Sequence, residues 1–126
     1  MERSGVWNLF DVLESDPIQP GERFHWTWLA TADHSTLNLV QAQGSAEPDS
    51  SRLHVHAEHD ETAYIIQGQA QFRLGEETQP VQSGSVIFVP AGMVHGPVQG
   101  DKLAILSLYG PSFDPDNPDR EFVGGE

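Results

Sequence analysis

The sequence predicts a single domain of the all-β class, built as a sandwich or a barrel. The chain has 126 residues, which fits one domain and leaves little room for a second. It consists of many short β-prone runs separated by Gly, Pro, Asp and Gln, a spacing typical of sandwiches and barrels. It contains no long repeat and no amphipathic helical pattern of more than two turns.

The expected strands are rich in the aromatic and β-branched residues that pleated sheets favour. The run Phe24–Leu29 is aromatic, and Thr36–Val40 alternates with the period of two of a half-buried strand. Turn residues fall between these runs. In chain order, the predicted strands are Leu9–Leu13, Arg23–Ala30, Thr36–Gln41, Arg52–His56, Thr62–Ile66, Ala70–Leu74, Val86–Val89 and Leu103–Tyr109.

The end of the chain differs in composition from the rest. Residues 111–119 carry three prolines and three aspartates, which is incompatible with regular structure. The segment either lies on the β domain or forms a disordered end. We therefore divide the chain into a β domain over residues 1–110 and a Pro/Asp-rich tail over residues 111–126.

Charge and composition exclude several classes of function. Six basic and nineteen acidic residues give a formal net charge of −13, which repels nucleic acid and anionic lipid. The chain has no cysteine, so disulfides, thiolate metal sites and a cysteine nucleophile are excluded. No apolar run is long enough to span a membrane, and the N-terminus lacks the pattern of a secretory signal. We expect a cytoplasmic protein.

A histidine-rich segment carries the first candidate site. His54 and His56 are two positions apart, so on a strand both side chains point to one face. A reversal after His56 would place Glu61 at the start of the neighbouring strand and on the same side. Two imidazoles and a carboxylate in this arrangement suit a divalent transition ion with open positions. The alternative is a polar, solvated loop, which is the reading we favour for His59.

A second segment strengthens the metal interpretation. Gly84 can begin a strand that ends at Pro90 and Gly92, residues suited to a tight turn, and His95 follows directly.

The two segments together resemble the paired motifs of the cupin superfamily. The first segment resembles the motif G-x5-HxH-x3,4-E-x6-G through His54, His56, Glu61 and Gly68. The second resembles the motif G-x5-PxG-x2-H-x3-N through Gly84, Pro90, Gly92 and His95. Pro48 and Gln99 stand where the motifs have Gly and Asn. The resemblance covers about residues 50–99 and implies a jelly-roll β-barrel over residues 1–110, of the small single-domain type.

The resemblance also implies the cofactor and its ligands. One divalent transition-metal ion, whether Fe, Mn, Ni, Zn, Co or Cu, would be held by His54, His56, Glu61 and His95, with Glu61 also a candidate catalytic proton acceptor. For the barrel interior we expect Ala63, Ile65, Val86, Phe88 and Leu106. The candidate substrate-binding residues are Ile65, Phe72, Phe88 and Trp28.

The sequence is compatible with three functions. A metal-dependent enzyme acting on a small organic molecule is favoured, with dioxygenase-type chemistry first and isomerase or lyase chemistry second. A non-catalytic small-molecule or metal-binding module is the third, since the fold alone does not decide. The few cationic residues form no obvious cluster for a sugar phosphate. By resemblance to small cupins, and because open sheet edges need covering, we expect a homodimer.

Overall fold

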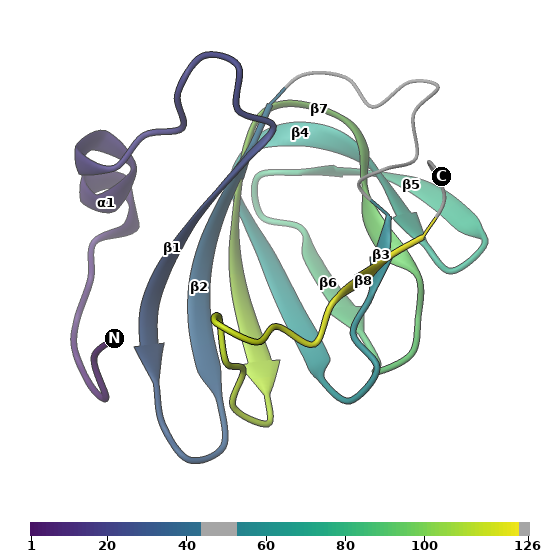
Figure 1. Ribbon diagram of the computed structural model, residues 1–126. Helices are drawn as coiled ribbons and strands as arrows, with labels where there is room; N and C mark the ends of the chain where they lie inside the picture. Colours follow the sequence, from purple (N-terminus) through teal and green to yellow (C-terminus); the bar gives the residue numbers. More distant parts are fainter. Residues whose placement is uncertain (44–52, 124–126) are drawn as a thin grey trace.

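The computed structural model describes residues 1–43 and 53–123, and in these the chain forms one curled antiparallel sheet (Figure 1). The prediction of an all-β jelly-roll fold is confirmed. The elements are helix α1 (Leu9–Ser15) and strands β1 (Phe24–Thr31), β2 (Thr36–Ala42), β3 (His54–Val55), β4 (Asp60–Leu74), β5 (Glu77–Gln82), β6 (Val86–Val89), β7 (His95–Gly110) and β8 (Glu121–Phe122).

Strands β4 and β7 form the centre of the sheet. They pair with each other from Asp60 opposite Gly110 to Leu74 opposite His95. On one side β7 continues to β2 and β1, and its first residue pairs with β3, which pairs with β8; β4 also pairs with β5 and β6. Figure 1 shows the resulting half-open barrel, with the C-terminal segment running across its opening.

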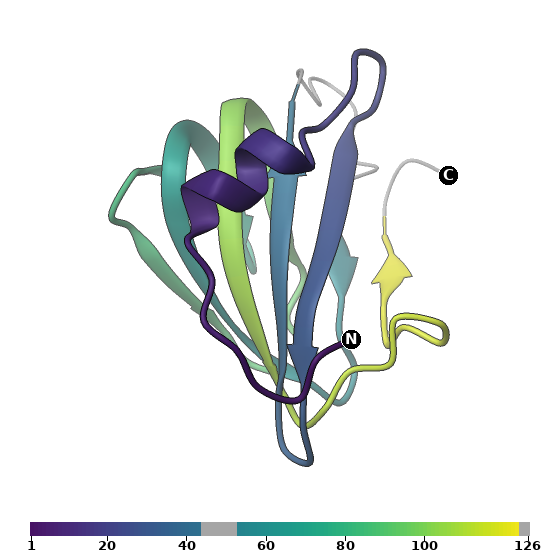
Figure 2. The ribbon, with the colours of Figure 1, turned by 90° about the vertical axis from the view of Figure 1, so that its left-hand side faces the viewer.

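Apolar side chains pack on both faces of this sheet, because neighbouring residues of a strand point to opposite faces. The barrel interior is filled from β2, β4 and β7 by side chains such as Val40, Ile65 and Ile105. The outer face carries a second cluster, around Leu39 and Ala104, that is covered by α1. Figure 2 shows α1 lying across this outer face, on the opposite side of β1 and β2 from the C-terminal segment.

The strand predicted over Leu9–Leu13 is wrong, because these residues lie in α1. Asn8 caps the helix: its side-chain oxygen accepts hydrogen bonds from the amides of Phe10 and Asp11 at 3.0 and 3.2 Å. Leu9, Val12 and Leu13 have the spacing of one helical face and pack against the outer cluster. Partial burial of that face stabilises a helix too short to form alone.

Several strand boundaries also differ from those expected. The runs Thr62–Ile66 and Ala70–Leu74 belong to one strand, β4, which continues through irregular register beside Gly68 at a φ of 83°. Strand β7 begins at His95 rather than at Leu103, and β5 was not expected. Of the strand predicted over Arg52–His56, Arg52 lies outside the described residues, as does Pro48.

The interior prediction is right for Ala63 and Ile65, which are 1% and 0% exposed. It is wrong for three other residues. Val86 and Phe88 are 63% and 59% exposed, because Ile87 and Val89 are the residues of β6 that point inward. Leu106 packs with the outer cluster beneath α1.

The described part of the tail lies on the barrel. Phe113 is buried, and its amide donates a hydrogen bond to the Thr36 hydroxyl at 2.7 Å. Residues 111–120 contain no helix or strand, as expected, and β8 then pairs with β3. Within the described residues, no helix has the length and apolar character needed to cross a membrane.

Candidate metal centre

Four side chains from three parts of the sheet converge inside the barrel. His54 lies in β3 directly opposite His95, the first residue of β7. His56 follows β3, and Glu61 lies near the start of β4. One ligand atom from each of His54, His56, Glu61 and His95 lies within 4.8 Å of the other three, so this group could hold a metal ion. His56, Glu61 and His95 are buried and His54 is half-buried.

The turn before β7 brings His95 to the other ligands. The amide of Gly92 donates a hydrogen bond to the carbonyl of His56 at 2.8 Å, and the amide of Ala91 donates to the Asp60 carboxylate at 2.9 Å. Gly92 has a φ of 87°, a conformation that side-chain-bearing residues rarely adopt. This turn ties the segment leading to His95 directly to the segment between His56 and Glu61.

Two imidazoles are oriented from behind by backbone carbonyls. Nδ1 of His56 donates to the Asp119 carbonyl at 2.7 Å, and Nδ1 of His95 donates to the Met93 carbonyl at 2.9 Å. With the proton fixed on Nδ1, each neutral ring presents the lone pair of Nε2 toward the barrel interior. This is the orientation of a metal-ligating histidine.

Glu61 presents one oxygen to each of two environments. Oε1 lies 3.2 Å from Nε2 of His56 and 3.1 Å from Nε2 of His95, and Oε2 accepts a 2.8 Å hydrogen bond from the Ser107 hydroxyl. Burial acts to raise the pKa of Glu61. When His56 and His95 also carry a proton on Nε2, their hydrogen bonds to Oε1 and their positive charges outweigh burial and hold that pKa well below its usual range. Glu61 is therefore ionised at neutral pH.

This donor set fits a cation. Oε1 of Glu61 faces two ring nitrogens whose lone pairs point at it when the rings are neutral, and a positive charge between them removes that repulsion. Donor atoms about 2.1 Å from one ion are at most about 4.2 Å apart. The observed limit of 4.8 Å is therefore close to a liganded arrangement.

A family comparison decides the classification. A model described as "Cupin domain" matches residues 41–109, more than half of the chain. The chain belongs to the cupin family. A curated relative, the uncharacterized protein SCO3923 of Streptomyces coelicolor, is 40% identical over 56 residues. That match spans 44% of this chain and about half the length of the relative.

Solved structures support the same fold. A Klebsiella pneumoniae protein with a double-stranded β-helix domain superposes with a TM-score of 0.72 at 15% identity, over 96% of this chain and 98% of its own. KdgF from Halomonas sp. gives 0.67 at 22% identity, over 79% and 89%. Streptomyces Pac13, a nucleoside dehydratase, gives 0.65 at 18% identity, over 82% and 80%. At these identities the likeness establishes the fold alone.

The histidine and glutamate side chains of this cupin open onto a cavity of about 520 Å³, a figure that includes the part open to solvent. Aromatic side chains form much of its wall, and an arginine from the tail reaches its mouth. Besides the four clustered side chains, the wall includes Phe24, Trp26, Phe72, Tyr109, Arg120 and Phe122.

The substrate-binding residues expected from the sequence are distributed differently. Phe72 lines the cavity. Ile65 is fully buried in the interior cluster behind the wall, and Trp28 lies against Phe113 and Tyr109, with ring centroids 5.6 and 6.3 Å away. Phe88 does not line the cavity, contrary to the prediction. Its exposed side chain points away from the barrel interior, because its neighbours Ile87 and Val89 point inward.

His59 is not a solvated loop residue, contrary to our expectation. Its Nδ1 donates to the Asp119 carboxylate at 2.7 Å and its Nε2 donates to the Ser112 carbonyl at 3.0 Å. Burial acts to lower the pKa of His59, but these two hydrogen bonds outweigh it and raise that pKa. Both ring nitrogens are therefore engaged by the tail, and His59 lies outside the group of four side chains that could hold a metal ion.

Sequence reasoning missed Ser107, Tyr109, Asp119 and Arg120. The first two had a usable signal: Ile105, Ser107 and Tyr109 alternate along one face of β7. Burial and the nearby Glu61 charge raise the pKa of Tyr109 well above its usual range, so its phenol stays protonated. Asp119 and Arg120 follow an irregular segment, where no periodicity indicates which way a side chain points.

Proposed function

We propose that this cupin is a metal-dependent enzyme that acts on a small organic molecule. One observation carries the proposal: Nε2 of His56 and Nε2 of His95 both approach Oε1 of Glu61, while each Nδ1 is committed to a backbone carbonyl. One divalent transition-metal ion held by His54, His56, Glu61 and His95 would satisfy all of these donor atoms.

The ligand types favour Mn, Fe, Co, Ni, Cu or Zn over Mg or Ca, because imidazole is a poor ligand for the hard cations. When bound, such an ion supplies a Lewis-acid centre for a substrate oxygen or, if redox-active, a site for dioxygen. Four protein donors leave room for exogenous ligands in five- or six-coordinate geometry.

The protein's own residues would orient the substrate. The wall of the cavity is largely apolar and aromatic, a low-dielectric surrounding in which polar interactions with a bound substrate would be stronger than in water. Tyr109 offers a protonated phenol at this wall. Glu61, with Oε2 held by Ser107 and its pKa depressed, is better suited to ligation than to accepting a proton, so its catalytic role depends on displacement from Ser107.

Dioxygenase-type chemistry is our first candidate, because the cavity beside the four ligand side chains has a largely apolar and aromatic wall, a surface suited to dioxygen and to a planar oxygenated substrate. Lyase or isomerase chemistry is the second. It is favoured by the fold similarity to Pac13, a nucleoside dehydratase. The third is a binding module without turnover.

Turnover with and without oxygen separates these candidates. Metal-loaded protein is given a panel of diketones, catechols, flavonols and nucleosides, and oxygen uptake is recorded beside substrate loss under argon. Oxygen uptake coupled to substrate loss supports the dioxygenase, and substrate loss under argon supports the lyase. Tight binding without consumption of any compound supports the binding module and contradicts both enzymatic readings.

We also propose that the protein is a homodimer. Four apolar residues of the outer face, Tyr64, Val86, Phe88 and Leu108, are each at least 42% exposed, and they lie on the paired strands β4, β6 and β7. Contiguous exposed apolar surface of this kind is typical of an interface. Sedimentation equilibrium tests the proposal: the wild type should be dimeric and Phe88→Glu largely monomeric. A wild-type monomer at micromolar concentration contradicts it.

A further inference from the structure

Arg120 is the cationic side chain that the fold brings to the metal-binding cavity, and it is held between two anchors. On its N-terminal side, the Asp119 carboxylate accepts hydrogen bonds from the amides of Ala57 and Glu58 at 3.0 and 2.7 Å. On its C-terminal side, β8 pairs with β3, and the amide of Val123 donates to the Leu53 carbonyl at 2.9 Å. The backbone of Arg120 is thus fixed at the cavity mouth.

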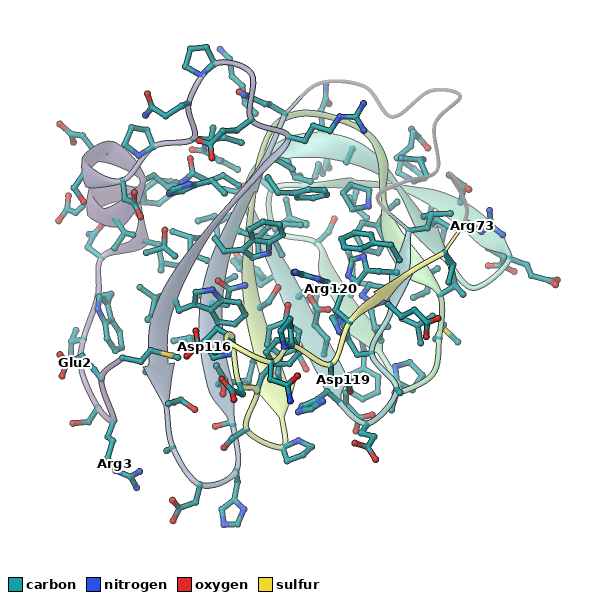
Figure 3. All side chains as sticks on the ribbon, viewed as in Figure 1. Glu2, Arg3, Arg73, Asp116, Asp119 and Arg120 are labelled. Carbon is teal, nitrogen blue, oxygen red and sulfur yellow. The ribbon has the colours of Figure 1, made fainter. Side chains whose placement is uncertain are left out.

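The guanidinium group is positioned by aromatic rings rather than by an acid. Its central carbon lies 4.9 Å from the ring centroid of Trp26 and 5.3 Å from that of Phe122. Such contacts orient the planar group and leave its edge N–H donors available. Figure 3 shows Arg120 projecting over the barrel opening, whereas Arg73 and Arg3 point outward at the edges of the molecule.

Within residues 1–43 and 53–123 Arg120 has no acidic partner, in a chain with nineteen acidic and six basic residues. Among the described residues, no carboxylate lies within ion-pair distance of Arg120, although Arg3 pairs with Asp33 at 3.3 Å. A partly buried guanidinium with free N–H donors is a preorganised site for an anion.

We propose that Arg120 binds the carboxylate of a small organic monoanion whose other end reaches the metal centre. This inference rests on the proposed function and names its substrate class. Arg120 and the four metal-binding side chains line one cavity, and the wall between them is largely apolar and aromatic. No Lys or second Arg from the described residues lines that cavity, which favours a singly charged carboxylate over a phosphate dianion.

Two probes that differ in one group test the proposal. Zinc-loaded protein is titrated calorimetrically with 3,4-dihydroxybenzoate and with 3,4-dihydroxybenzamide, which share the chelating diol and differ in charge. The wild type should bind the acid about tenfold or more tightly than the amide, as expected for a charge-assisted hydrogen bond. Arg120→Gln should remove this preference while leaving the affinity for the amide within about twofold.

Matched variants control for unfolding. Arg73→Gln removes an arginine whose side chain bonds the Gly75 carbonyl away from the cavity, and it should keep the wild-type preference. Arg120→Lys retains the positive charge but lacks the planar guanidinium group, and it should keep part of the preference for the acid over the amide. An undiminished preference in folded Arg120→Gln overturns the proposal, as does equal binding of both probes by the wild type.

A metal-free measurement separates this inference from the metal centre itself. In metal-free protein labelled with ¹⁵N, titration with benzoate should shift the Nε–H resonance of Arg120 but not that of Arg73. An unperturbed Arg120 resonance contradicts the anion site even if the protein binds metal. A perturbed resonance in a protein that takes up no metal supports the anion site and contradicts only the metal-dependent function.

Discussion

Nδ1 of His56 donates a hydrogen bond to the carbonyl oxygen of Asp119 at 2.7 Å, across 63 positions of the sequence. The same aspartate accepts hydrogen bonds through its carboxylate from the amides of Ala57 and Glu58 and from His59. The C-terminal segment therefore holds one candidate metal ligand in a defined tautomer and closes part of the cavity wall. The described part of the tail is therefore packed as a part of the barrel.

Replacing Asp119 should weaken metal binding without touching a ligand. In Asp119→Ala the three donors around the carboxylate lose their acceptor, and the carbonyl facing His56 is no longer held in place. Loss of such an outer support typically lowers metal affinity about 10- to 100-fold. Competition with a chromophoric chelator measures the change.

Asp116→Ala is the matched control, since Asp116 is an exposed aspartate of the same segment (Figure 3). The metal affinity of Asp116→Ala should equal that of the wild type. Equal affinities of Asp119→Ala and Asp116→Ala would show that the tail does not support the site.

Ser107 holds the other side of the Glu61 carboxylate. In Ser107→Ala the buried Oε2 loses its hydroxyl donor, and a hydrogen bond to a buried charged group contributes about 1.5–3 kcal/mol. We expect the free energy of unfolding of the metal-free protein to fall by about that amount, as measured by urea denaturation. Stability equal to that of the wild type would mean that Ser107 does not support the carboxylate.

The contact between His25 and Asp16 gives a pH-dependent contribution to stability. Nε2 of His25 lies 2.9 Å from the Asp16 carboxylate, which also accepts a 2.8 Å hydrogen bond from the Thr27 hydroxyl. The hydrogen bond to Asp16 raises the pKa of His25, and hydrogen bonds from Thr27 and His25 lower the pKa of Asp16.

The signs of these two pKa shifts define the pH range in which the contact between His25 and Asp16 stabilises the fold. The raised histidine pKa stabilises the fold below about pH 6.5, an effect lost as the pH rises through the folded-state pKa. The lowered aspartate pKa stabilises the fold above about pH 3.9, an effect lost as the pH falls through its folded-state pKa. His25→Gln should therefore lose more stability near pH 5.5 than near pH 8.5 in urea denaturation, whereas exposed His34→Gln should lose little at either pH. An equal loss from His25→Gln at both pH values contradicts this account.

The sequence was most informative where spacing alone determines geometry. His54 and His56 share a strand face, and a reversal after them was expected to bring Glu61 alongside. That His95 joins these three was implied by the resemblance to the cupin motifs, and the structure brings the four side chains together. The all-β class followed from the many short β-prone runs of the sequence.

The remaining features depend on which neighbour covers a side chain. Phe88 lies in an apolar run of four residues with no alternation, so only its pairing within the sheet decides which face is buried. The seven residues of α1 are too few for a clear helical period, although Asn8 as an N-cap was a signal that could have been used. The position of Arg120 follows from the path of a proline-rich segment across the barrel, which no local pattern specifies.

Metal content by inductively coupled plasma mass spectrometry tests the central claim most directly. Wild-type protein, incubated with Mn, Fe, Co, Ni, Cu or Zn and then desalted, should retain about one transition-metal ion per chain for at least one of these metals. His56→Ala should lose most of that metal, and His34→Ala, which removes an exposed histidine, should retain it. Retention of a full ion by His56→Ala, or absence of bound metal from the wild type after loading, would contradict the metal centre.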